Sequence, residues 1–467
     1  MAELHELGVQ ELIAAFRAGQ ASPVDAVEAC LSRIDAVDPR LNAVLTLCED
    51  QARRSAAESE RRWLAGAARP LEGVPFGLKD IIKTAGIPTT GGSLIYKDYV
   101  PAESATVAVR LAAAGAVLLA KLQTMEFAMG GNSHYGPTLN PWDGGRVTGG
   151  SSSGSAVSIM AEEMPFAIGT DTGGSIRIPS LFCGATGLKP SFGGVSRHGV
   201  LPLAWTLDHV GPMARSAADV GLVLNAIWGP DAADPYSIGY AACDPRSGPD
   251  TDLRGVRVAV CREWFFDLLE PCAEEAADRV IAVLTDLGAD VFEVSIPLAG
   301  LADTVCWVII LAEMAALHSG TINRLDDYGE LVTRQLLINA QFVRTADYLR
   351  ALRMMPLIQR EADAVFSVAD ALLVPGMPTA APRMTEEGFR IRGRQYPWQE
   401  IISRTMSFFN VTGLPALAIP AGHSAEGLPV GVQVASALGA DAMCLRIGAA
   451  IQRHTAFHRA RPRSPAG

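Results

Sequence analysis

The sequence predicts an α/β protein, and three observations support this prediction. The chain has 467 residues, of which 49% are hydrophobic and 19% charged, and its mean hydropathy is +0.20, so it can bury a large core. Short apolar runs of strand character alternate with helical segments, which favours a sheet with helices packed on its faces. No internal repeat or low-complexity linker divides the sequence. We therefore expect a single domain over residues 1–467.

Helix signals open the chain. Ser22 and Pro23 form an N-cap and a first-turn proline, and apolar residues then recur at helical spacing. Ser104 is expected to cap a second helix over residues 105–114. A strand is expected directly after it, over residues 116–120.

The pattern changes twice after this point. Between residues 73 and 211, glycine, serine and proline are dense among short apolar runs, which indicates strands and tight loops. Helices are then expected over residues 217–228, 273–287, 301–366, 399–409 and 441–452. Strands are expected over residues 256–261, 290–294, 371–375, 416–420 and 430–435. The tail, about residues 459–467, is expected to be disordered.

Charge and cysteine usage exclude several classes of function. A net charge of −11, from 39 Lys and Arg against 50 Asp and Glu, gives no basic surface for nucleic acid. The eight cysteines contain no C-x-x-C pair, which fits a reducing compartment and argues against a zinc site. No apolar run has the length of a membrane span, and the N-terminus has no signal-peptide pattern. We expect a cytoplasmic protein that uses no metal or cofactor and binds neither nucleic acid nor membrane.

Two serine- and glycine-rich segments and one lysine carry the predicted chemistry. Residues 149–155 read G-G-S-S-S-G-S, and residues 169–179 read G-T-D-T-G-G-S-I-R-I-P. Consecutive glycines let backbone N–H groups surround an anion, with a serine beside the charge of a tetrahedral intermediate. Lys79 lies in an apolar run, where desolvation would lower its pKa and make it a base. Taken singly, these features also fit flexible loops and a solvent-facing lysine on an edge strand.

Together, the three motifs resemble those of the amidase signature family. Residues 73–80 match its G-V-P-x-x-x-K-D segment, and the spacing from Ser151 to Ser175 is also that of the family. Matches at other positions extend the resemblance over nearly the whole chain: residues 22–23, 41–43, 187–190, 410–416 and 427–433. The resemblance implies an α/β amidase signature fold, with a large mixed β-sheet flanked by helices on both faces and a signature core at about residues 70–215.

The resemblance also implies a role for each catalytic residue. Ser175 would attack the carbonyl carbon and become the acyl-enzyme, while Ser151 relays its proton to a neutral Lys79. The peptide bond before Ser151 is expected to be cis. Asp171 and Arg177 are expected to brace the nucleophile loop. The oxyanion hole would consist of the N–H groups of Thr172, Gly173, Gly174 and Ser175.

The motifs leave the substrate open. Met129, Gly130 and Gly131 are expected to bind it, with residues 306–360 and 377–398 as further pocket walls. The expected partners are a small amide-like molecule and water, and a homodimer is left open. Carbamates, hydrazides and esters pass through the same tetrahedral chemistry and stay among the options.

Three rival interpretations remain. The G-x-S-x-G match at residues 150–154 would make Ser152 the nucleophile of an α/β-hydrolase, although the residues before it are too polar for the required strand. A non-enzymatic scaffold would not need the lysine and the two serines. The nearest rival is the amidase subunit of a glutamine-dependent tRNA amidotransferase, which belongs to the same family and passes ammonia to a partner. Residues 407–415, S-F-F-N-V-T-G-L-P, are more similar to free-standing amidases, so an amidohydrolase is the first expectation.

Overall fold

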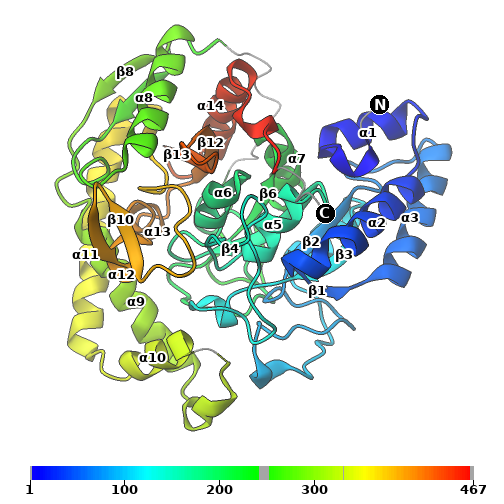
Figure 1. The fold of residues 1–467 in the computed structure, drawn as a ribbon, viewed down its shortest axis with the longest axis horizontal. Helices are drawn as coiled ribbons and strands as arrows, with labels where there is room; N and C mark the ends of the chain where they lie inside the picture. The colour runs from blue at the N-terminus through cyan, green and yellow to red at the C-terminus, as the bar shows by residue number, and fades with distance from the viewer. Residues whose placement is uncertain (1–2, 241–251, 330, 463–467) are drawn as a thin grey trace.

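A mixed β-sheet of eleven strands forms the centre of the protein (Figure 1). The structure is a computed structural model and describes residues 3–240, 252–329 and 331–462. The strands of this sheet are β1 (Val44–Leu47), β2 (Pro75–Lys79), β3 (Val117–Leu122), β4 (Phe166–Asp171), β5 (Thr186–Lys189), β6 (His209–Ala214), β7 (Arg257–Val260), β8 (Asp290–Glu293), β9 (Ala371–Pro375), β12 (Ala416–His423) and β13 (Pro429–Ser436). They lie side by side in the order β1-β3-β2-β4-β6-β5-β12-β13-β9-β7-β8. Strands β2 and β7 pair in parallel with both neighbours and the other pairs are antiparallel, which confirms the predicted mixed sheet.

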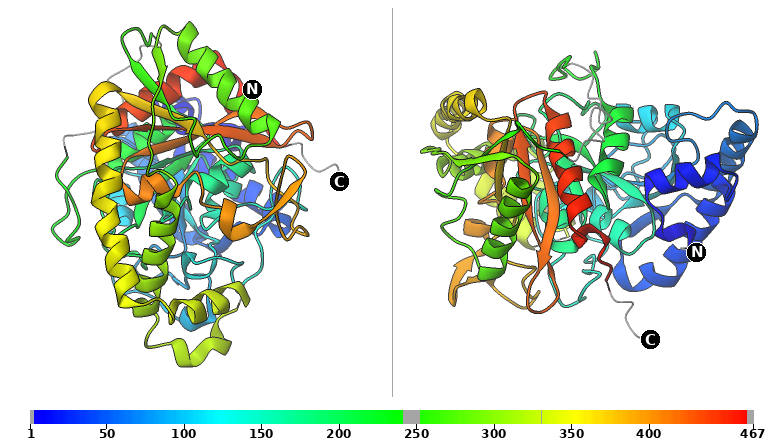
Figure 2. Two further views of the ribbon diagram at one scale, coloured as in Figure 1. Left: turned by 90° about the vertical axis from the view of Figure 1, so that its left-hand side faces the viewer. Right: turned by 90° about the horizontal axis from the view of Figure 1, so that it is seen from above.

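Helices cover both faces of this sheet, as predicted (Figure 2). The α-helices of the described chain are α1 (Val9–Arg17), α2 (Pro23–Leu41), α3 (Glu49–Leu64), α4 (Thr106–Ala113), α5 (Ser153–Met160), α6 (Arg177–Cys183), α7 (Ala217–Ile227), α8 (Pro271–Asp286), α9 (Leu301–Leu317), α10 (Leu331–Ala340), α11 (Thr345–Val368), α12 (Trp398–Ile401), α13 (Ser407–Val411) and α14 (Asp441–His454). Side chains of β9 alternate between the two faces. Leu373 packs in one cluster with α8 and α14, whereas Leu372 and Val374 pack in another with α9 and α11.

The two predicted helix starts have different outcomes. Ser22 caps α2 as expected, because its Oγ accepts from the N–H of Asp25 over 3.1 Å and Pro23 occupies the first turn. Helix α4, by contrast, is not capped by Ser104. The Oγ of Ser104 accepts from the N–H of Ala85 over 2.9 Å, and the helix begins one residue after Ala105. The Ser104 hydroxyl therefore stabilises a neighbouring turn and not the helix.

Two short helices, α5 and α6, lie in the region where the sequence predicted strands and loops. Every residue of both helices is buried. A helix buried on all sides has no polar face, so its periodicity cannot be recognised in the sequence. Close packing explains the small residues: a Cβ atom at Gly154 would lie 2.5 Å from the carbonyl oxygen of Ala43.

The helical region expected over residues 301–366 is three helices, α9, α10 and α11, with a 3₁₀ turn at Ile322–Asp327. The chain turns around the buried side chain of Tyr328. Its hydroxyl lies 2.8 Å from Nδ1 of His318 and 2.6 Å from Oγ1 of Thr321. These contacts fix the break after α9.

The C-terminal part shows three further differences from the expectations. The helix expected over residues 399–409 is two helices, α12 and α13, because the side chain of Thr405 and the carbonyl of Met406 between them bind other segments. No sequence pattern predicted the hairpin of β10 (Gly388–Ile391) and β11 (Arg394–Pro397). In the tail, Nε of Arg461 donates to Glu162 over 2.7 Å, so this residue packs on the body of the protein. Residues 463–467, also expected to be disordered, lie outside the described residues.

Within the described residues, no helix combines the length and the apolar character needed to cross a bilayer.

Candidate active site

Lys79 ends β2 in the sheet, and its side chain is completely buried. Its Nζ atom lies 2.6 Å from Oγ of Ser151 and 2.8 Å from Oγ1 of Thr170, which is hydrogen-bond distance in both cases. Burial lowers the pKa of Lys79 to about 7, and the charges of Asp171 and Asp208 oppose that lowering. The lysine is therefore not a solvent-facing edge residue, and a large fraction of it is neutral near pH 7.

Ser151 lies just before α5, and the peptide bond that joins it to Gly150 is cis, as expected. The side chain of Met125 packs directly against Gly150, so a Cβ atom there would collide with it. The N–H of Met125 also donates to the carbonyl of Ser151 over 3.1 Å. Met125 therefore contacts the Ser151 loop through both its side chain and its backbone.

Ser152 is held by the backbone of β4. Its Oγ donates to the carbonyl of Thr170 over 3.1 Å and accepts from the N–H of Thr170 over 3.2 Å. The residue is fully buried, and no strand of the described chain precedes it in the way an α/β-hydrolase nucleophile requires. Its hydroxyl is thus engaged in holding the loop and is poorly placed to attack a substrate.

Ser175 lies on the loop between β4 and α6 and is partly exposed. The N–H of Ser152 donates to the carbonyl of Ser175 over 3.1 Å, which joins this loop to the Ser151 loop. The loop turns at Gly174, where φ is +117°, and a Cβ atom there would lie 2.7 Å from Ile178. Glycine is required at this position by both conformation and space.

The carboxylate of Asp171 braces the loop of residues 172–176, which carries the predicted nucleophile Ser175 and is here called the nucleophile loop. It accepts from the N–H of Gly174 over 2.8 Å and from that of Ile176 over 3.1 Å. Arg177 binds it through Nε and Nη2 at 3.1 and 3.0 Å, and both side chains are fully buried. Although burial acts to raise it, the pKa of Asp171 is held well below its usual range by Arg177 and Asn410.

Of the four N–H groups expected in the oxyanion hole, one already has an acceptor within the protein. The N–H of Gly174 is engaged by Asp171, so this expected donor is not free in the structure. Among the described residues, no acceptor takes the N–H of Thr172, Gly173 or Ser175. The hydroxyl of Thr172 donates to Asp208 over 2.6 Å.

Helix α9 covers the nucleophile loop. A Cβ atom at Gly173 would lie 3.7 Å from both Sγ of Cys306 and Cδ1 of Ile310, one turn apart on this helix. Further along, the carboxylate of Glu313 accepts from the N–H of Thr206 over 3.0 Å. One helix therefore reaches both the nucleophile loop and the segment around residue 206.

The expected substrate-binding residues Met129, Gly130 and Gly131 follow a tight turn and lie beside α10. The hydroxyl of Thr333 on α10 donates to the carbonyl of Gly130 over 2.9 Å. Gly130 and Gly131 have φ values of +146° and +73°, which suit glycine. The structure thus places Gly130 against α10, five residues after Met125, which contacts the Ser151 loop.

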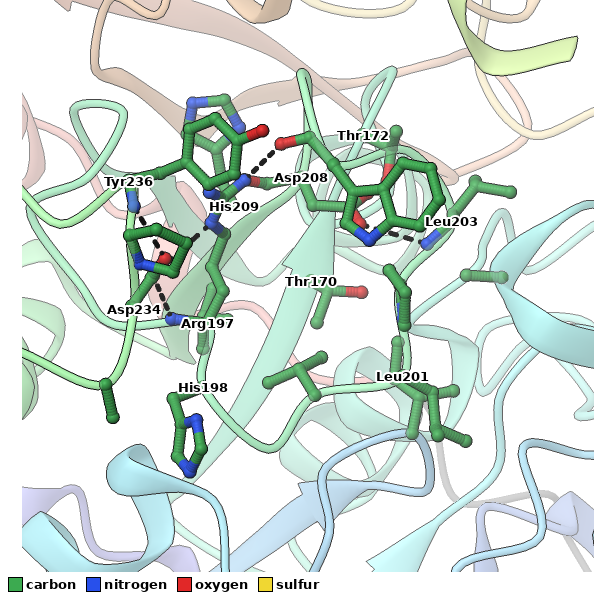
Figure 3. Close-up of a pocket in the computed structure, with 18 residues that line it drawn as sticks. Thr170, Thr172, Arg197, His198, Leu201, Leu203, Asp208, His209, Asp234 and Tyr236 are labelled. Atoms are coloured by element: carbon green, nitrogen blue, oxygen red, sulfur yellow. Dashed lines mark hydrogen bonds and ion pairs between the residues drawn. The ribbon is translucent and has the colours of Figure 1, made fainter. Parts of the chain in front are cut away.

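A cavity of about 360 Å³ opens beside this site (Figure 3). Thr170 and Thr172 line it from β4 and the nucleophile loop, and Asp208 and Leu201 line it from the opposite segment. The sequence interpretation missed Thr170 and Asp208. Thr170 lies in the motif of Ser175, which is a usable signal, whereas no local pattern marks Asp208.

In the part of the chain that the structure describes, no group of three or more His, Cys, Asp or Glu side chains could hold a metal ion.

Comparison with known proteins agrees with this geometry. The Amidase family model matches residues 25–445. A glutamyl-tRNA(Gln) amidotransferase subunit from Chloroflexus aurantiacus is 40% identical, with 99% of each chain covered. A solved structure of a vestigial protein complex, connected with the origins of an s-triazine catabolic enzyme, is 33% identical at a TM-score of 0.91, with 98% of this chain and 100% of that chain covered. A peptide amidase bound to chymostatin is 32% identical at a TM-score of 0.85, with 98% and 99% covered.

The fold and the family match identify the chain as an enzyme that hydrolyses carbon–nitrogen bonds. The chain belongs to the amidase family, and its fold is that of the amidase signature enzymes.

Proposed function

We propose that this chain is a serine amidohydrolase that cleaves the C–N bond of a small amide through an acyl-enzyme at Ser175. The observation that carries the proposal is the buried Lys79, whose Nζ lies 2.6 Å from Oγ of Ser151. In its neutral form the lysine accepts the Ser151 proton and donates to Thr170. One catalytic domain over the whole chain is part of the proposal, and the continuous sheet supports it.

The reaction proceeds in two steps, acylation of Ser175 and hydrolysis of the acyl-enzyme. Oγ of Ser175 attacks the carbonyl carbon, and its proton passes through Ser151 to Nζ of Lys79. The C–N bond breaks as the same proton returns through Ser151 to the leaving nitrogen, which departs as ammonia or an amine. Water then attacks the ester of Ser175 by the same relay, and the carboxylic acid leaves.

The oxyanion of each tetrahedral intermediate would be bound by backbone donors of the nucleophile loop. The N–H groups of Thr172, Gly173 and Ser175 support this role because they have no acceptor among the described residues. Gly174, by contrast, uses its N–H to anchor the loop on Asp171.

A second candidate function is the release of ammonia from glutamine for a partner protein. The 40% identity to the glutamyl-tRNA(Gln) amidotransferase subunit from Chloroflexus aurantiacus, over 99% of both chains, favours it over the first candidate. The S-F-F-N-V-T-G-L-P segment at residues 407–415 favours the first candidate. Both functions use the same chemistry at Ser175 and differ in substrate and in the need for a partner.

The deciding experiment compares the purified chain alone with the chain plus the other amidotransferase subunits. The substrates are a panel of primary amides, anilides, carbamates, ureas and esters, together with glutamine. Hydrolysis of a panel compound by the chain alone, lost in Ser175→Ala, supports the free-standing enzyme. Glutaminase activity that appears only with the added subunits would replace it by the second candidate.

A further inference from the structure

Asp208 lines the same cavity as Thr170 and Thr172 (Figure 3). Its Oδ1 accepts from the hydroxyl of Thr172 over 2.6 Å, and its Oδ2 accepts from the N–H groups of Leu203 and Ala204 over 2.9 and 3.1 Å. The backbone of residues 203–204 thus holds the carboxylate in place. Through one short hydrogen bond the carboxylate fixes the first residue of the nucleophile loop.

The carboxylate of Asp208 also affects the pKa of Lys79, the proposed base. Thr170, two residues before Thr172, lies 2.8 Å from Nζ of Lys79 and lines the same cavity as Asp208. The negative charges of Asp171 and Asp208 both favour the protonated form of Lys79, against the larger effect of burial. Removing either charge should therefore make the lysine a weaker base.

The two carboxylates differ in how far their charge is compensated. Asp171 forms a 3.0 Å ion pair with Arg177. Asp208 has no ion pair among the described residues, and the nearby Arg197 pairs instead with Asp234 at 3.5 Å. The Asp208 charge therefore acts on its surroundings without a direct counter-ion.

We propose that Asp208 is a positioning residue that couples the two halves of the catalytic site. It holds the nucleophile loop through Thr172, and its negative charge keeps Lys79 basic enough to accept a proton. The inference rests on the proposed serine amidase chemistry, because it assigns a role relative to Ser175 and Lys79.

The other charged or titratable groups at the cavity are Arg197, His198, His209, Asp234 and Tyr236. Burial and the charge of Lys189 hold the pKa of His209 well below its usual value, so His209 is neutral over the working range. Burial raises the pKa of Asp208 to about 6, against the hydrogen bonds from Thr172, Ala204 and Leu203 that act to lower it. Asp234 accepts from the N–H groups of Arg197 and Tyr236 and makes no contact with the nucleophile loop, which suits it as a control.

The test measures the rate at which a fluorophosphonate probe labels Ser175 as a function of pH, which requires no knowledge of the substrate. In the wild type the rate should rise with pH as Lys79 loses its proton. Asp208→Asn should lower the midpoint of this rise by about 1 pH unit, and Asp234→Asn should leave the midpoint unchanged. Thr172→Val should slow labelling about tenfold at an unchanged midpoint, and Thr172→Ser should recover most of that loss.

The outcomes separate this inference from the proposed function. A wild type that is not labelled at Ser175 would overturn the proposed function, and this inference with it. A labelled wild type whose midpoint is the same in Asp208→Asn would overturn the inference alone. Circular dichroism confirms that each variant is folded, and should Asp208→Asn not fold, a wild-type labelling rate in Thr172→Val would overturn the inference by itself.

Discussion

Arg177 and Asp171 form a fully buried ion pair, with 3.0 Å between Nη2 and Oδ1. The remaining donors of the arginine are also used inside the protein, by Gln433 at 2.7 Å, Asn410 at 2.7 Å and the carbonyl of Met406 at 3.2 Å. The pair therefore joins the nucleophile loop to β13 and α13. Although both residues lie in the motif of Ser175, their contacts are structural.

Replacing Arg177 by lysine should destabilise the protein strongly. A lysine cannot reproduce the planar set of donors, so Asp171, Asn410 and Gln433 would lose partners inside the core. Leaving a buried polar group without its hydrogen-bond partner costs about 1 to 3 kcal/mol in free energy of unfolding. Urea denaturation of Arg177→Lys measures this loss, with Arg61→Lys as the matched control, since Arg61 pairs with Glu58 on the exposed surface. A loss below about 1 kcal/mol would contradict the bracing role.

The enzyme rate should rise with pH through neutrality. The base must be neutral to accept a proton, and burial lowers the pKa of Lys79 to about 7, so activity falls as pH drops below that value. The apparent pKa belongs to the coupled Lys79, Ser151 and Ser175 unit. A profile of kcat/KM against pH from 5 to 9 measures it. A rate that does not change between pH 6 and 8 would argue against a titrating base.

Substitutions of Lys79 distinguish a general base from a residue that acts only through its positive charge. Lys79→Arg keeps a positive charge that cannot be lost near neutral pH, so kcat should fall by at least about 100-fold. Lys79→Ala should lose activity to a similar degree while circular dichroism shows an intact fold. A folded Lys79→Arg variant with near wild-type kcat would refute the general-base role.

The buried lysine should also reduce stability in a pH-dependent way. Its pKa is lower in the folded than in the unfolded chain, so the unfolded state binds more protons and stability rises as pH increases from about 7 toward 10. Lys79→Met should be more stable than the wild type below pH 7 by at least about 1 kcal/mol, since a pKa change of one corresponds to about 1.4 kcal/mol. Thermal unfolding at several pH values measures the difference, which should shrink with rising pH. Lys121→Met is the control and should be less stable than the wild type. It removes the ion pair of Asp80, which lies 3.0 Å from Nζ of Lys121.

Labelling should identify the nucleophile. A fluorophosphonate should add one adduct at Ser175, and Ser175→Ala should abolish both labelling and hydrolysis. Ser152→Ala should still be labelled, because the Ser152 hydroxyl is engaged by the backbone of Thr170. Mass spectrometry of the modified peptide locates the adduct, and an adduct on Ser152 would reverse the assignment.

Chelation should leave the activity unchanged. The described residues contain no cluster of metal-binding side chains, and the proposed steps use only a lysine and two serines. Activity after prolonged EDTA treatment, compared with an untreated sample, measures this. Activity lost on chelation and restored by zinc would require a different mechanism.

The sequence predicted those parts of the fold and site that local patterns encode. The helix start at Ser22 depends on neighbouring residues, and the mixed sheet was implied by the family resemblance. Specific motifs mark the segments of Lys79, Ser151 and Ser175, whose catalytic roles stay predictions. Contacts between distant segments were not predictable in the same way. The bond between Thr172 and Asp208 joins segments that the sheet brings together, and nothing near Asp208 in the sequence marks its partner.

Other elements could not be predicted from the sequence, because burial or tertiary contacts determine them. Helices α5 and α6 are enclosed on all sides and show no amphipathic pattern. The break after α9 depends on the tertiary contacts of Tyr328, and the cap expected at Ser104 was lost to a competing backbone donor. In each case, contacts with residues outside the element decide what a local pattern leaves open.

Helix α9 touches the nucleophile loop near Cys306 and Ile310 and, at Glu313, the segment around residue 206, yet it contributes no residue to the proposed proton relay. Its apolar side chains next to Gly173 can therefore vary in size while β2, β4 and α5 keep the reacting atoms in place. We expect a small library restricted to these α9 positions to change which acyl groups the enzyme accepts. Directed evolution of substrate range in this protein should begin on that helix.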